Sequence, residues 1–275
     1  MSGGWPISPE QCNGQSVGNS TATSKVTPLT ITTTLVQTKN AYTQLIASTV
    51  GDAQWMDITY SQLGTNFPIN TTCYSDIAIG AGGSEVIIIN NLTMGGGTNA
   101  SCGSKWTFPV NIPNGSRVAA RFAYSTSTTT TTNIAPAMGI QLFDGGMTAG
   151  EGFAGVDAVG QTNGVGTQLL TTTTANKKGA YTQLTAAAAR DYAGFVINGD
   201  TAAGNQFYLI DVAVGAGGVE QNILSNYQFG NGFTGQSPQS QTIMMPVPSG
   251  TRISARAQCA TASGFINCTF YGIYA

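Results

Sequence analysis

The chain has 275 residues, of which 8% are charged, 41% are hydrophobic and none is histidine, and its formal net charge is −2. This length allows one large domain or two ordinary ones, and the apolar fraction is too high for a disordered chain. The charge balance excludes the basic surfaces that bind nucleic acid or anionic membranes, and the lack of histidine removes the most common general base of enzymes.

Nothing in the sequence is typical of membrane insertion or export. No apolar run approaches the about 20 residues that a membrane helix needs. The first 30 residues lack the basic and apolar regions of a secretory signal. We therefore expect a protein that is made in the cytoplasm and has no membrane partner.

The first 30 residues are dominated by Gly, Ser, Thr, Pro and Asn, and their one aromatic residue is Trp5. This composition is typical of a segment without a core of its own. We expect residues 1–30 to form an extended N-terminal arm that packs on its own domain or, as we favour, on a neighbouring chain. Trp5 is the candidate contact residue of this arm.

Short runs of β-branched and aromatic residues, separated by turn residues, fill positions 31–143. They predict strands, and no segment has a convincing helical period. We therefore expect residues 31–143 to form a jelly-roll-like antiparallel β-sandwich domain. The predicted strands are 29–36, 42–46, 55–60, 76–80, 86–89, 106–110, 117–122 and 138–143.

Residues 144–167 contain many glycines and little apolar periodicity, which predicts a Gly-rich linker. Residues 168–275 then follow the plan of the first domain and predict a second β-sandwich. The predicted strands of this domain are 168–174, 181–184, 193–197, 207–214, 222–224, 243–247, 252–258 and 265–273. The expected fold is all-β, with two tandem jelly-roll-like domains.

The chain repeats its own landmarks in the same order and at nearly constant spacing. Solenoid repeats have periods of about 20–50 residues, so a much longer period indicates a duplicated domain. The matching segments are Lys39–Leu45 with Lys178–Leu184, Asp76–Glu85 with Asp211–Glu220, and Ile112–Arg121 with Val247–Arg256.

The Gly-rich stretches 80–83 and 215–218 could be taken for phosphate-binding loops. A P-loop is followed by Lys-Ser/Thr and by a helix whose N-terminus meets the anion. Here Glu85 and Glu220 follow, and then predicted strands. We interpret both stretches as tight strand connections that need positive φ angles.

Two pairs of arginines lie four residues apart on predicted strands, and each pair therefore shares one face. Arginine could bind phosphate or carboxylate groups of a ligand. The duplication of these arginines beside duplicated carboxylates favours structural ion pairs, either between strands of one domain or across a subunit boundary. The residues concerned are Asp76, Glu85, Arg117, Arg121, Asp211, Glu220, Arg252 and Arg256.

Two carboxylates suffice for glycoside hydrolysis, but the carboxylates of this chain do not cluster in sequence, and the repeated ones lie beside Gly-rich turns. We therefore predict no catalytic residues, no cofactor and no metal. Aromatic side chains could stack on a sugar, although aromatics in strands usually belong to the core. The sugar-binding candidates are Tyr42, Trp55, Trp106 and Tyr181.

The five cysteines lack the Cys-x-x-Cys spacing of zinc sites. Cys259 and Cys268 could face each other across a hairpin and form a disulfide, and Cys73 could meet Cys102. Half-buried thiols without any disulfide are the alternative that we favour.

The segments TKNAYTQLIAST, SDIAIGAGGSEVIIINNL and IPNGSRVAAR resemble a module of tailed-bacteriophage structural proteins. Its pattern is an IGxGGxE turn, an apolar strand and an IPxGxRIAAR hairpin. The resemblance covers about residues 38–123 and again about 177–258. The second copy departs from the pattern at residues 219–222, where polar residues dilute the apolar strand.

The resemblance implies a non-enzymatic virion protein, as found in capsid decoration, tail or fibre proteins. We predict a decoration or cement protein that binds the major capsid protein and assembles as a homo-oligomer, with a trimer as the expected form. The alternative is a tail or fibre component that binds tail proteins and a host-surface glycan. A carbohydrate-active enzyme is the third and least favoured reading.

Overall fold

The computed structural model describes residues 14–17, 37–63, 73–93, 104–125, 135–143, 153–202, 207–230 and 241–275, and every structural statement below refers to them. Several sequence predictions lie outside these residues. They are the contact residue Trp5, the strand at 29–36 and the cysteines Cys12 and Cys102.

The described part of the chain is built from β-strands, as the pattern of short β-branched and aromatic runs predicted. The strands of the first half are β1 (Gly14–Val17), β2 (Thr43–Ile46), β3 (Trp55–Leu63), β4 (Cys73–Ile79), β5 (Val86–Thr93), β6 (Ser104–Phe108), β7 (Val118–Tyr124) and β8 (Ala135–Phe143). Those of the second half are β9 (Gly155–Val159), β10 (Gln161–Thr162), β11 (Val165–Leu170), β12 (Thr182–Thr185), β13 (Gly194–Ala202), β14 (Phe207–Val214), β15 (Gln221–Gly230), β16 (Ile253–Cys259) and β17 (Phe265–Tyr274).

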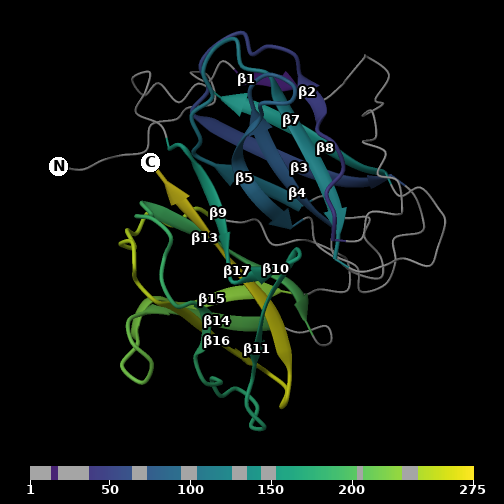
Figure 1. Cartoon of the computed structure of the whole chain (residues 1–275). Helices are drawn as coiled ribbons and strands as arrows, with labels where there is room; N and C mark the ends of the chain where they lie inside the picture. The colour runs from purple at the N-terminus through teal and green to yellow at the C-terminus, as the bar shows by residue number, and fades with distance from the viewer. Residues whose placement is uncertain are drawn as a thin grey trace.

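These strands form three sheets (Figure 1). The first sheet has the order β1-β8-β3-β6, and the third has the order β12-β16-β14-β15. The second sheet runs β10-β11-β17-β9-β5-β4-β7-β2, and β13 also pairs with β17. All pairings between named strands are antiparallel except that of β5 with β9. The all-β class and the antiparallel sandwich architecture are therefore confirmed.

The topology repeats as the sequence does. The order β2-β7-β4-β5 in the first half corresponds to β12-β16-β14-β15 in the second, and the pair β3·β8 corresponds to β13·β17. We call residues 14–143 the first copy and residues 153–275 the second copy.

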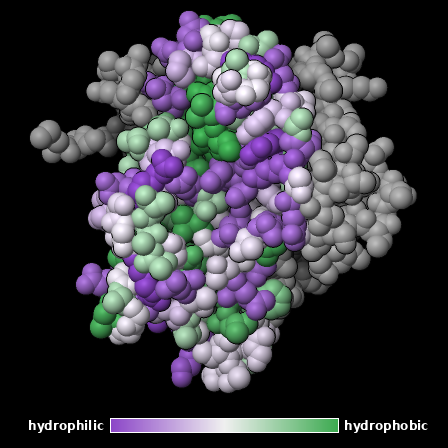
Figure 2. Space-filling view, in the orientation of Figure 1, coloured by the Kyte–Doolittle hydropathy of each residue, from purple (hydrophilic) through white to green (hydrophobic). Residues whose placement is uncertain are grey.

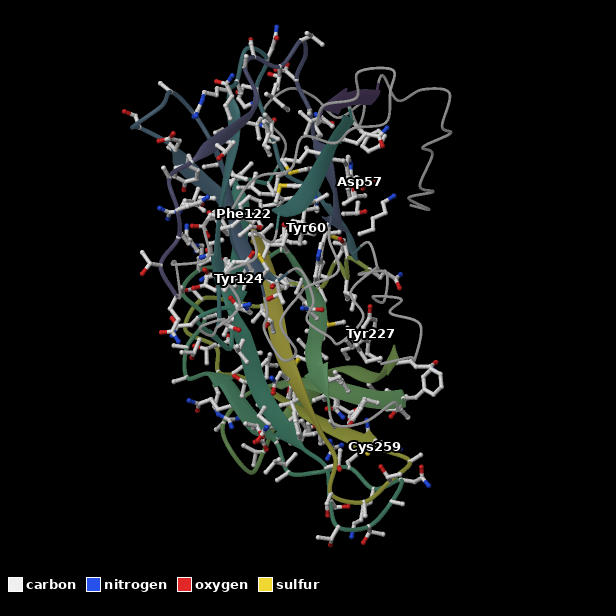
Figure 3. The ribbon with its side chains drawn as sticks, turned by 90° about the vertical axis from the view of Figure 1, so that its right-hand side faces the viewer. Asp57, Tyr60, Phe122, Tyr124, Tyr227 and Cys259 are labelled. Carbon is white, nitrogen blue, oxygen red and sulfur yellow. The ribbon has the colours of Figure 1, made fainter. Side chains whose placement is uncertain are left out.

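Each copy encloses a cluster of buried apolar side chains. Tyr60, Phe122 and Tyr124 belong to the first cluster. Cys259 belongs to the second cluster, and Tyr227 packs against it. The two groups lie in the upper and lower halves of Figure 3. The first cluster also includes Val156, Val196, Tyr271 and Ile273 of the second copy, so the two cores are not separated at the boundary between the copies.

The predicted linker 144–167 is wrong for the residues that the structure describes there. Residues 155–159 form β9, which inserts between β17 and β5, and β10 and the start of β11 follow. The glycines serve close packing here, because a Cβ added at Gly155 would lie 2.7 Å from the Ile88 carbonyl oxygen and 2.5 Å from the Tyr274 hydroxyl. The abundance of glycine in this segment therefore reflects close packing between strands, not a linker.

The favoured position of the N-terminal arm, on a neighbouring chain, is also wrong for residues 14–17. These residues form β1, which pairs with β8 of the same chain from Gly14 opposite Phe143 to Val17 opposite Ile140. This part of the arm is therefore an edge strand of its own sheet.

The predicted strand 243–247 is reduced to two isolated bridges, which join Ile243 to Phe195 and Val247 to Tyr192. Pro246 lies between the two bridging residues and has no backbone N–H to donate to a ladder. Continuous pairing is therefore interrupted at this point.

Candidate functional site

The duplicated Gly-rich turns bind carboxylates of their own chain. In the first turn φ is +112° at Gly80 and +85° at Gly83, a region that favours glycine. The Gly83 N–H donates to Glu85 Oε2 at 2.8 Å. The second turn repeats the contact, with Gly218 N–H donating to Glu220 at 2.9 Å. Strands, not helices, follow both turns, so the N–H groups that could have bound a phosphate are used internally.

One arginine in each copy fastens the turn to the neighbouring strand. Arg117 donates to Glu85 Oε1 at 3.0 Å, to the Gly80 carbonyl at 3.2 Å and to Gln44 Oε1 at 3.0 Å. Its guanidinium thus joins the turn and β2 at one point. The second copy repeats all three contacts with Arg252, which donates to Glu220 at 3.2 Å, to Gly215 at 3.1 Å and to Gln183 at 3.1 Å.

A buried aspartate forms the centre of a second group of contacts in each copy. The Asp76 side chain is 1% exposed; it pairs with Lys39 Nζ at 2.5 Å and with Arg121 Nε at 2.8 Å, and it accepts the Asn91 N–H at 2.9 Å. Asp76 lies opposite Arg121 in the ladder between β4 and β7. The pair therefore bridges strands within one copy.

The second copy reproduces this centre. Asp211 pairs with Lys178 at 2.6 Å and with Arg256 at 2.9 Å, and it accepts the Asn226 N–H at 2.8 Å. The two asparagines that donate these N–H groups also share a left-handed backbone, with φ of +47° at Asn91 and +55° at Asn226. Asn tolerates this conformation better than most residues do. Both ion-pair clusters are thus built by the same local geometry.

The contacts of Asp211, Glu85 and Glu220 lower the pKa values of these three carboxylates. Burial raises the pKa of Asp211, but Lys178, the Asn226 N–H and Arg256 outweigh this effect, and the pKa lies below its ordinary value. The pKa values of Glu85 and Glu220 also lie below their ordinary value. The largest cause is the hydrogen bond from the backbone N–H of the same residue, and the glycine N–H groups and the paired arginines add to it. A carboxylate held in this way is a poor general acid or base at neutral pH.

The two tyrosines that were candidates for sugar binding contact the arginines of the clusters. The Arg121 guanidinium lies 4.7 Å from the Tyr42 ring centroid, and that of Arg256 lies 4.5 Å from the Tyr181 ring centroid. Such cation–π contacts orient the arginines towards their aspartates.

Neither tryptophan candidate has a fully exposed ring on which a sugar could stack. Trp106 is buried, stacks on Phe108 and meets the edge of Tyr271 at 5.4 Å between ring centroids. Trp55 begins β3 and is half-buried. Trp106 and the tyrosines are therefore parts of the framework.

The candidate disulfide between Cys259 and Cys268 does not form. Both are buried thiols, as is Cys73. Cys259 ends β16 in the third sheet, whereas Cys268 lies within β17 in the second sheet. The segment between the two cysteines therefore connects two different sheets and is not the turn of a hairpin. Burial raises the pKa of the Cys73 thiol, which keeps it unreactive.

The sequence reasoning missed two groups of polar residues. Lys39 and Lys178 complete the two aspartate centres, and their place at the start of a repeated segment was the signal that could have identified them. Burial lowers the pKa of Lys39, with Asp76 opposing the change.

The second missed group has no counterpart in the first copy. Arg190 pairs with Asp157 on β9 at 2.8 Å and stacks on the Tyr274 ring at 4.1 Å. The Tyr192 hydroxyl donates to Asp157 at 3.5 Å. Burial raises the pKa of Asp157, with Arg190 opposing the change. This group anchors β9, the strand that joins the two copies.

Within the described ranges, no group of three or more His, Cys, Asp or Glu residues is arranged to hold a metal ion. The same part of the chain contains no helix with the length and hydropathy to span a membrane. Hydrophobic residues on the face in Figure 2 occur as separate patches among polar ones.

Comparison with known proteins gives little beyond this description. No family model matches the chain, and no curated protein matches it. One solved structure, "Structure of infectious bursal disease virus Gx strain", aligns with 83% of this chain at 8% identity and a TM-score of 0.25. The alignment covers 58% of that viral chain. At this TM-score the likeness carries no argument about fold or function.

Proposed function

We propose that the protein is a non-enzymatic structural component of a tailed-bacteriophage virion, and specifically a capsid decoration or cement protein. The observation that carries the proposal is the use of the duplicated acids and bases. In both copies they lock neighbouring strands, and they belong to the segments that resemble the phage module. A rigid framework that is repeated within one chain suits a protein whose task is mechanical.

The proposed partner is the major capsid protein, and the proposed assembly is a homo-oligomer, with a trimer as the expected form. Many identical copies on a symmetric shell make many weak contacts, and avidity then compensates for the modest affinity of each contact. A surface with few charges suits such contacts, because little desolvation of ions is needed. Residues 1–13, with Trp5, are the proposed docking arm.

Binding of the purified protein to phage particles that lack it tests this proposal. We expect the protein to bind these particles and to raise the temperature at which they release DNA, and we expect no binding to host cells. A variant without residues 1–13 keeps β1 and should fold but fail to bind.

The other outcomes are also informative. Binding to host cells or to their surface glycans, without binding to capsids, would overturn the decoration role and favour the tail or fibre alternative. If the protein hydrolysed a glycan, and if the substitution of one carboxylate by its amide abolished this activity without unfolding the protein, the enzyme alternative would be favoured.

A further inference from the structure

Two strands that correspond in the duplication have different surroundings. In the first copy β5 pairs with β4 on one edge and, in parallel, with β9 on the other, where Ile89 lies opposite Val156. The Asn90 side chain also accepts the Ala158 N–H at 2.6 Å. In the second copy, β15 pairs with β14 alone among the described strands and ends its sheet. The outer edge of β15 is therefore without a described strand partner.

The exposure of matched side chains follows this difference. Ile89 and Leu92 on β5 are 0% exposed. Their counterparts on β15, Leu224 and Tyr227, hold the same ladder positions but are only half-buried. The missing neighbour leaves apolar surface on β15 uncovered.

The edge of β15 lacks the features that normally prevent strand addition. Natural edge strands are protected by lysine or other charges, by proline, or by being short. The sequence of β15, QNILSNYQFG, is ten residues long and contains no charged residue and no proline. Irregular register occurs where β15 pairs with β14, but the same irregularity occurs between β4 and β5. Since β5 is nonetheless covered, this irregularity does not prevent pairing.

The counterpart of β9 in the first copy is β1. Each pairs antiparallel with the last strand of its copy: β1 with β8, and β9 with β17. Their sequences also correspond, as Val17-Gly18-Asn19-Ser20 and Val159-Gly160-Gln161-Thr162. The second edge of β9 binds β5, whereas the second edge of β1 has no partner among the described strands.

The open edges of β1 and β15 lie far apart in one chain. Figure 1 shows β1 at the outer end of the first copy and β15 in the second copy. We infer that β15 of one chain adds in parallel to β1 of a second copy of this chain, repeating the pairing of β5 with β9. In this register Leu224 of one chain lies opposite Gly14 of the next. Such a head-to-tail contact gives a ring if it closes and a filament if it does not.

The proposed contact between chains, β15 with β1, is expected to be weaker than the pairing of β5 with β9 within one chain. At the internal junction the Tyr271 hydroxyl accepts the Thr93 N–H at 2.9 Å and donates to the Asn91 carbonyl at 3.2 Å. The matched residue on β8 is Gln141, which is exposed. Association between chains should therefore depend on protein concentration. The inference does not rest on the virion assignment.

The mass of the full-length protein in solution, measured by sedimentation over a range of concentrations, tests this inference. We expect wild-type protein to form species larger than the 28.3 kDa chain, and Ser225→Lys to remain monomeric because the new charge lies on the pairing edge. Thr173→Lys, at an exposed position in a turn, should assemble as wild type does. A wild-type protein that is monomeric throughout, or a Ser225→Lys variant that assembles normally, would overturn the inference.

Disulfide trapping determines the register independently of that result. In a Cys12→Ser background, Gln15→Cys combined with Ser225→Cys should give covalent oligomers on oxidation, whereas each substitution alone should give none. Covalent dimers from Ser225→Cys alone would show that two β15 edges meet each other, and would contradict the head-to-tail arrangement.

Discussion

At the scale of single residues, the stability of each copy depends on one buried carboxylate. Asp211 neutralises both Lys178 and Arg256, and its side chain is 4% exposed. Asp211→Asn keeps the shape but removes the charge, and it leaves two cations without a counter-ion. Because unpaired buried charge is costly, we expect the free energy of unfolding to fall by about 3 kcal/mol, measured by chemical denaturation.

The matched control for this substitution is Asp191→Asn. Asp191 is exposed and accepts one hydrogen bond, from the Ser249 N–H at 2.7 Å. An amide oxygen can accept the same bond, so the change should be within about 0.5 kcal/mol. Equal losses in the two variants would show that the buried pairs do not matter for stability.

The Gly-rich turns allow a second test at this scale, because two adjacent glycines differ only in backbone conformation. An added Cβ meets nothing within 4 Å at either Gly82 or Gly83, but only Gly83 has a left-handed φ. Gly83→Ala should therefore lower the free energy of unfolding by about 1–2 kcal/mol. Gly82→Ala should leave it nearly unchanged, and a similar cost at both positions would contradict the assigned turn geometry.

At the scale of elements, strands with long runs of β-branched or aromatic residues could be predicted from the sequence. Short strands in Gly-rich segments could not. Runs such as Val86–Ile89 carry β-branched residues on both faces, which is typical of covered strands. In contrast, β9 has only five residues, GVDAV, within a Gly-rich segment, and its place in the sheet depends on β5 and β17 far away in sequence. Local pattern cannot encode such long-range pairing.

The same reasoning explains which part of the candidate site could be predicted. Duplication identified the acids and arginines, because their spacing relative to glycines is repeated. It could not identify the junction between copies, because the side chains of Asp157 and Tyr271 are not repeated in the first copy, where Gln141 occupies the position that matches Tyr271. The candidate disulfide was wrong because residues close in sequence were assumed to share a hairpin.

The junction between the copies allows a prediction of its own. Tyr271 of β17 is fully buried and belongs to the core of the first copy, although it comes from the second. Tyr271→Phe leaves the Thr93 N–H and the Asn91 carbonyl without this partner, which should lower the free energy of unfolding by about 1–3 kcal/mol. Tyr181→Phe, which removes an exposed hydroxyl bonded to Asn222, should cost less than about 1 kcal/mol. Equal effects would show that the junction does not contribute.

At the scale of the whole molecule, two similar sandwiches share one continuous sheet through β9. The chain therefore already contains one contact between copies, and the proposed contact between chains repeats it. A protein that extends in this way is suited to cover a surface with repeated units. A decoration protein needs this ability to assemble in repeated copies, whereas a receptor-binding protein can act without it.

The most direct test of the virion role is the number of copies of this protein in purified phage particles. Quantitative mass spectrometry against the major capsid protein provides this ratio. We expect at least about one copy for every three capsid proteins, because a decoration protein follows the symmetry of the shell. A ratio below about one to twenty would place the protein in the tail. Its absence from the particle would contradict the virion role altogether.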